Sequence, residues 1–160
     1  MAARRYRGPA TALAAAMAAL FATAASAAPV SWDDLKAPAL AAGGEVELTG
    51  FLLPVDYEGD DVYQFMLLPW AGACSHTPPP PPDQVVLVTP AKPIRIERTY
   101  EPVSVSGHLN RTRDISQLFI LDGVAWVESG YRIRSASVQP ADIPAAPPPA
   151  GSTPWKFLNK

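Results

Sequence analysis

The stretch "EVELTGFLLPVDYEGDDVYQFMLLPW", residues 45–70, decides the fold. In its first half, apolar residues alternate with others, and the alternation changes phase after Gly50. Alternation with a period of two predicts a β-strand, and a glycine inside it predicts a bulge or a bend. After the turn-forming sequence "YEGDD", residues 57–61, the run over 62–70 is rich in β-forming residues. The stretch therefore predicts two strands joined by a turn.

The rest of the chain also consists mainly of short apolar or alternating runs separated by turn-forming residues. The Asp-Gly pair at 122–123 lies between two apolar runs, which predicts a β-hairpin. Helical periodicity is almost absent, except for a short helical turn in "APVSWDDLKAP", residues 28–38, where Ser31 and Asp34 can cap each other. Further short apolar or alternating runs occupy residues 84–90, 93–100, 102–111, 117–123 and 124–138.

These runs predict an all-β fold of six to eight short strands in a single domain over residues 28–138. A small barrel or a sandwich would bury the apolar faces and limit the exposed strand edges. The patterns "V-x-L-x-G-F" and "V-x-V-x-G-x-L" favour strands that bend at glycine to close a barrel. We therefore expect a small OB-like, partly open barrel rather than an immunoglobulin-type sandwich, with a short N-terminal helical turn and a proline-rich C-terminal tail.

The N-terminus has the layout of a secretory signal peptide over residues 1–27. Arg4, Arg5 and Arg7 precede an uncharged apolar run over 10–25, and "ASA" ends the segment. A membrane-anchoring helix is the alternative, but this alanine-rich run is shorter than the roughly 20 strongly apolar residues that a bilayer span needs. We expect cleavage before Ala28, export to the periplasm and no stable membrane insertion afterwards.

Cleavage would leave 133 residues, with ten basic against fifteen acidic side chains, so that the formal charge moves from −2 to −5. The mature chain has no basic stripe. Phosphate binding requires such positive charge, so nucleic acid is excluded as an expected partner.

The one cysteine, Cys74, excludes an intramolecular disulfide and lies in "GACSHTPPPPPDQVV", residues 72–86. In an extended chain, Cys74 and His76 would point to the same face, and thiolate and imidazole are ligands that zinc prefers. Two ligands do not complete a tetrahedral site. The remaining candidates for a further ligand are His108, Asp83, Asp114 and Asp122.

Three other interpretations of this segment stay open. A thiol-based enzyme would use Cys74 activated by His76. A structural cysteine would be buried, as cysteines often are. In a protein-interaction module, the polyproline rod would offer a pre-ordered surface to a partner, through Pro78, Pro79, Pro80, Pro81 and Pro82.

The C-terminal segment, residues 139–160, is predicted to be a proline-rich linker that ends in "WKFLNK". The last six residues are either a frayed terminus or a tethered anchor that docks on its own domain or on a partner.

The proline block and its flanks resemble a bacterial exported family without assigned activity, whose members read G-A-C-x-H-x-P-P-P-P-x-Q. The similarity extends from Ser31 to Val138 and includes "SWDDL", "F-x-L-L-P" and "V-x-V-x-G-x-L". The resemblance implies a periplasmic protein encoded beside ABC-type transporter components and a periplasmic metal-binding protein, in gene clusters that respond to zinc scarcity. It therefore implies a non-enzymatic accessory protein in zinc homeostasis, with zinc as the ion that Cys74 and His76 would contact.

Overall fold

The computed structural model describes residues 27–37, 43–72, 79–120 and 123–143. This part of the chain is all-β with almost no helix, as expected. Two short 3-10 helices, η1 (Asp34–Lys36) and η3 (Pro82–Gln84), accompany the strands. The seven strands are β1 (Ala28–Pro29), β2 (Gly44–Glu58), β3 (Asp61–Leu68), β4 (Val86–Pro90), β5 (Ile94–Arg95), β6 (Glu101–Ile120) and β7 (Gly123–Pro140).

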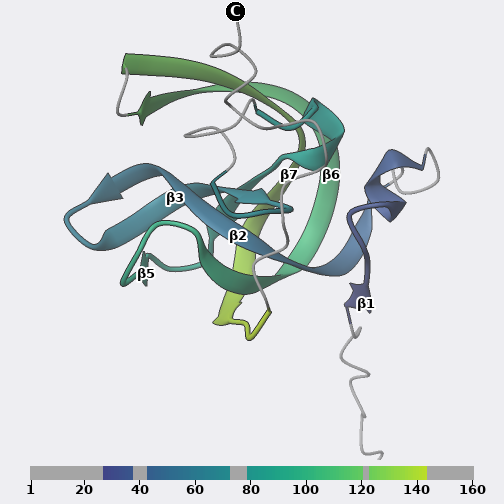
Figure 1. The fold of residues 1–160 in the computed structure, drawn as a ribbon. Coiled ribbons are helices and arrows are strands. Elements are labelled where there is room, and N and C mark those ends of the chain that lie inside the picture. The colour runs from purple at the N-terminus through teal and green to yellow at the C-terminus, as the bar shows by residue number, and fades with distance from the viewer. Residues whose placement is uncertain (1–26, 38–42, 73–78, 121–122, 144–160) are drawn as a thin grey trace, which may run out of the picture.

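Five of the strands form a closed ring of pairings in the order β2-β6-β7-β4-β3 and back to β2 (Figure 1). The ring closes because β2 serves two neighbours: residues 44–52 pair with β6, and residues 51–58 pair with β3. Only the β4–β7 pairing within the ring is parallel. β1 pairs with β2, and β5 pairs with β3, both outside the ring.

Two glycines lie where the pairing changes. Gly50 is next to the point where β2 passes from β6 to β3, and a Cβ there would lie 2.7 Å from the carbonyl oxygen of Leu68. Gly107 lies in a register shift between β6 and β7, where a Cβ would meet Ile133 Cγ2 at 2.7 Å. Any larger residue would push the two backbones or side chains apart.

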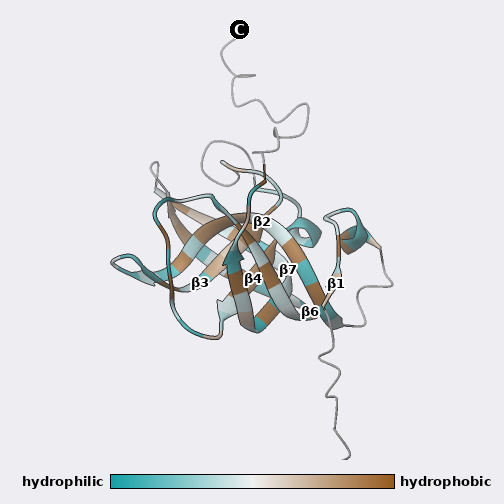
Figure 2. Ribbon diagram, turned by 90° about the horizontal axis from the view of Figure 1, so that it is seen from below, coloured by the Kyte–Doolittle hydropathy of each residue, from teal (hydrophilic) through white to brown (hydrophobic). Residues whose placement is uncertain are grey.

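The apolar residues gather in two clusters, and Figure 2 shows them concentrated on the strands while the turns are polar. The larger cluster fills the ring and includes Phe65, Val88 and Tyr131. The second cluster lies under the far half of the β6–β7 hairpin, where Leu118 and Val127 pack with Met66, Leu68, Val85 and Leu87. The hairpin therefore packs on the rest of the domain as far along as Leu118 and Val127.

The N-terminal helical turn is present as η1, with the predicted reciprocal contacts. The Ser31 backbone N–H and hydroxyl both donate to Asp34 Oδ2 at 2.7 Å, and the Asp34 N–H donates to Ser31 Oγ at 3.3 Å. The hydrogen bonds from Ser31 hold the pKa of the Asp34 carboxyl below its usual value. The bond from the Ser31 side chain has the largest effect, and the one from its backbone N–H comes next. The buried Leu35 and the partly buried Trp32 pack against the ring, and Tyr131 Oη donates to the Leu35 carbonyl at 2.6 Å. This turn therefore covers part of the main core.

Three expectations about the strands need correction. Residues 102–111 and 117–123 are not separate strands, because β6 runs without a break from Glu101 to Ile120. The run over 93–100 gives a strand only at Ile94–Arg95. β7 continues to Pro140, so the first two residues of the predicted linker belong to the sheet, where Pro140 pairs with Val103.

The predicted signal peptide, except for its last residue, and the tail from residue 144 lie outside the described residues. Within the described part, no helix is long and apolar enough to cross a membrane.

Candidate functional site

The segment with the proline block, residues 72–86, is called the signature segment below. After Gly72, the structure describes it only from Pro79 onward. Cys74, His76 and Pro78 lie outside the described residues, so their predicted roles stay predictions. From Pro79 the chain is described: Pro80 is buried, whereas Pro79, Pro81 and Pro82 are exposed. The segment then forms η3 and enters β4, which lies in the ring. Three of the prolines predicted to contact a partner are therefore accessible.

Gln84 fixes this segment to the N-terminal turn. Its side chain is 6% exposed, and Nε2 donates to the Trp32 carbonyl at 2.8 Å and to the Asp83 carbonyl at 3.0 Å. A buried amide without partners would be costly, so these two bonds explain why a glutamine can occupy a buried position before an apolar strand. The sequence contained this residue as the final glutamine of the signature, but it gave no sign that its partner lies 52 residues earlier.

Gly130 on β7 provides the second attachment. A Cβ at this position would lie 2.6 Å from the Pro82 carbonyl oxygen and 2.9 Å from its carbonyl carbon. Because both atoms belong to the backbone, η3 can lie against β7 only if residue 130 has no side chain. The exposed prolines are thus held between the N-terminal turn and the ring.

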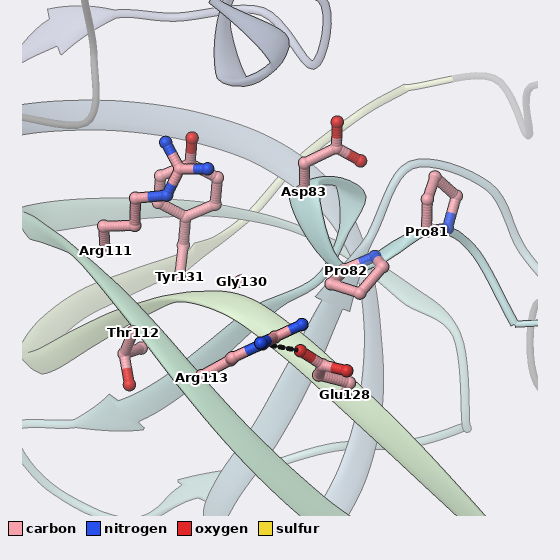
Figure 3. A pocket seen from close by; sticks show the side chains of 9 residues that line it. All are labelled: Pro81, Pro82, Asp83, Arg111, Thr112, Arg113, Glu128, Gly130 and Tyr131. Carbon is pink, nitrogen blue, oxygen red and sulfur yellow. Dashed lines mark hydrogen bonds and ion pairs between the residues drawn. The ribbon is translucent and has the colours of Figure 1, made fainter. Parts of the chain in front are cut away.

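An open depression of about 750 Å³ lies beside the prolines (Figure 3). Pro81, Pro82 and Asp83 form one side, and residues of β6 and β7 form the other. The β6–β7 pairing shifts register here, with two residues of β6, 112–113, opposite Gly130 alone. This extra residue is a β-bulge, and bulges re-aim the side chains around them.

Charged and aromatic side chains line the depression. The guanidinium carbon of Arg111 lies 6.0 Å from the centre of the Tyr131 ring, which places it for a cation–π contact. Arg113 Nε donates to a Glu128 carboxylate oxygen. Asp83 has one buried carboxylate oxygen, Oδ1, without a hydrogen-bond partner among the described residues. With exposed prolines, arginines and carboxylates side by side, this surface can hold a polypeptide through its backbone and its charges.

The four further ligands considered for Cys74 and His76 lie in different surroundings. His108 Nδ1 is 3.7 Å from Glu45 Oε1 at the start of β2. Asp114 accepts hydrogen bonds from Thr112 Oγ1 at 2.7 Å and pairs with Arg132 Nη2 at 3.1 Å, so its carboxylate is already in use. Asp122 lies outside the described residues. Only Asp83 belongs to the signature segment itself and keeps an oxygen without a partner.

Among the described residues, no three His, Cys, Asp or Glu side chains come together as a metal site requires. Sequence reasoning missed Gln84, Gly130, and the Arg111–Arg113 bulge, because each acts through a residue that is distant in the sequence. The two arginines in "NRTRD", with one residue between them, were the only sequence signal that could have indicated the bulge.

Comparison with known proteins supports membership of a family without assigned function, which is part of the resemblance seen in the sequence. No curated protein matches the chain. The crystal structure of a DUF3299 family protein from Pseudomonas aeruginosa PAO1 is similar at a TM-score of 0.58 and 23% identity, covering 75% of this chain and 99% of that one. At this level of identity the similarity shows a shared fold. Residues 8–140 match the sequence profile of the family described as "Protein of unknown function (DUF3299)". The chain therefore belongs to the DUF3299 family.

Proposed function

We propose that the protein is a non-enzymatic accessory protein of the periplasm that binds another protein through the end of its signature segment. The observation that carries this proposal is the way Pro81 and Pro82 are held: exposed to solvent, yet fixed by Gln84 on one side and by Gly130 on the other. A segment that is already ordered loses little conformational entropy when it binds. The mixed charges of the adjoining depression add directional contacts for the same partner.

The order of pairings supports the finer proposal that the ring is an OB-like barrel. In an OB fold, the first strand pairs with the second and the fourth, and the third and fifth strands are parallel neighbours. Here β2 takes the place of the first strand, and β4 and β7 are the parallel neighbours. OB-like barrels serve as platforms for ligand binding, mostly of nucleic acid or sugar. The acidic balance of this chain favours a protein partner over nucleic acid.

We propose further that the partner belongs to a transporter-linked system of metal homeostasis, with zinc as the ion. The predicted signal peptide, Cys74 with His76, and the resemblance to an exported family support this. Partners of this kind are ABC-type transporter components or another periplasmic metal-binding protein. Asp83 supports the metal part, because its unpartnered Oδ1 lies in the same segment as the proposed ligands.

Recovery of the partner from envelope extracts tests the interaction. The native protein is expected to retain one envelope protein, whereas a variant with Gly and Ser in place of Pro79 to Pro82 should lose it. The control variant Lys92→Ser carries its substitution in the exposed β4–β5 connection and should keep the partner. Equal recovery with all three proteins would refute the proposed surface.

Zinc titration of the purified protein tests the metal part. Binding at micromolar or lower concentration is expected, with a loss of at least about tenfold in affinity when either Cys74→Ala or His76→Ala removes a ligand. Asp83→Asn tests the third ligand in the same way. Binding that is absent, or unaffected by Cys74→Ala and His76→Ala together, would contradict the zinc assignment.

A further inference from the structure

A second hollow lies on another part of the ring and shares no lining residue with the depression beside Pro81 and Pro82. This groove has a volume of about 660 Å³ and runs between the β2–β3 turn, the segment after β5 and the far part of β6. Its walls are largely apolar and include Leu53, Val55 and Ile96. Two aromatic residues that line it, Tyr57 and Phe119, are 58% and 80% exposed. Large aromatic side chains exposed beside an apolar groove mark a place where another segment can bind.

The two chain segments beside the groove are acidic. Residues 56–61 and 95–101 together carry six acidic side chains and two arginines, a net charge of −4. One of the arginines, Arg95, is already engaged in an ion pair with Asp61, at 3.2 Å. A segment that combines apolar side chains with positive charge would therefore match both the walls and the surroundings of the groove.

The described chain ends close to this groove. The Ala141 N–H donates to the Pro102 carbonyl at 3.0 Å, and Tyr100, two residues before Pro102, lines the groove and donates its N–H to the Leu52 carbonyl at 2.8 Å. The chain thus leaves the ring beside the groove wall, with residues 144–160 still to follow. This segment contains three large apolar side chains, Trp155, Phe157 and Leu158. It also contains two basic residues, Lys156 and Lys160, and no acidic side chain.

We propose that residues 155–160 dock in this groove of their own chain. The eleven residues between Ile143 and Trp155 reach on average about 18 Å as a flexible coil, and about 34 Å when extended as polyproline. Both lengths suffice for a groove that begins beside the point where the chain leaves the ring. The apolar side chains of the tail would cover Tyr57 and Phe119, and its two lysines would face the acidic segments.

Tethering makes even a weak contact effective. A short linker keeps the tail at an effective concentration in the millimolar range. If the dissociation constant of the contact is about 1 mM, the tail would thus be bound in the groove in at least half of the molecules. Any other ligand of the groove would have to displace the tail, which makes the tail a built-in competitor. The groove shares no lining residue with the proposed partner site, so docking of the tail does not depend on that site.

Amide NMR spectra of the native protein and of the variant Trp155→Ser/Phe157→Ser/Leu158→Ser test the proposal. The variant is expected to shift the amide signals of groove residues such as Gly59, Thr99 and Phe119, while Asn159→Ser, a control in the same tail, leaves them in place. High salt should produce a similar but smaller shift, because it screens the lysines.

The signals of Arg113 and Gly130, which line the depression beside Pro81 and Pro82, provide the internal reference. Changes confined to the tail itself, or changes at these two residues in place of the groove, would overturn the proposal. Groove shifts that disappear on dilution would also overturn it, since they would show that the tail of a second copy occupies the groove.

Discussion

The side-chain amide of Gln84 donates a hydrogen bond of 2.8 Å to the carbonyl oxygen of Trp32. This contact joins the signature segment to the N-terminal turn. Gln84→Ala removes the only side-chain donor to that carbonyl among the described residues, and the loss of a buried partner costs about 1–3 kcal/mol. We therefore expect the free energy of unfolding to fall by that amount in urea titration. Gln117→Ala, an exposed glutamine on β6, is the control and should change it by less than about 0.5 kcal/mol.

The buried hydroxyl of Tyr131 makes a second long-range bond, to the Leu35 carbonyl at 2.6 Å. Tyr131→Phe keeps the ring in the core but leaves that carbonyl unpaired, so we expect a loss of about 1–3 kcal/mol in thermal or urea unfolding. Tyr63→Phe removes a hydroxyl from a tyrosine that is 40% exposed and should have little effect. Equal effects of the two substitutions would show that the bond to Leu35 does not stabilise the turn.

Gly130 lies against the backbone of Pro82, so even one methyl group should disturb the signature segment. Gly130→Ala places a Cβ 2.6 Å from the Pro82 carbonyl oxygen, and we expect a destabilisation of about 1–3 kcal/mol from this overlap. The substitution should also weaken partner recovery, because η3 would have to move. At Gly44, a Cβ would meet no atom within 4 Å, so Gly44→Ala is the matched control for unfolding measurements. Similar stability of the two variants would contradict the close packing of η3 on β7.

The pKa of the Asp34 carboxyl should be below that of an ordinary aspartate, because Ser31 donates to it from both its hydroxyl and its backbone N–H. A carboxyl with a lowered pKa adds stability at pH values above the pKa of the unfolded state, and that contribution is lost as the pH falls through the folded-state value. Ser31→Ala removes the hydroxyl, so NMR titration should show the pKa of Asp34 rising toward its usual range. A titration that is unchanged by this substitution would mean that the hydroxyl bond does not form in solution.

Local patterns predicted the strands well, since alternation and turn residues act over a few neighbours. The Ser31–Asp34 contacts followed from such a pattern. Strand length was harder to predict: β6 contains Gly107 and the polar sequence "NRTRD", which look like breaks. Pairing with β7 from Val103 to Ile120, and with β2 from Glu101 to Leu109, keeps the strand continuous.

The surface beside the signature could not be predicted, because it depends on contacts between distant residues. Gly130 is informative only once Pro82 is known to lie against it, and Gln84 only once Trp32 is known to be its partner. The sequence did identify the proline block as the segment of interest. It could not indicate that the bulge at residues 112–113 would place arginines beside that block.

Site-specific photocrosslinking in living cells tests the central proposal, that the signature end binds a partner protein, most directly. A photoreactive phenylalanine analogue would replace Pro82, which is exposed at the depression, and Lys92, which is exposed elsewhere, would carry it as the control. We predict one discrete adduct with an envelope protein from position 82 and none from position 92, with the adduct reduced when Gly130→Ala is added. The absence of an adduct at position 82, or the same adducts from both positions, would contradict the account.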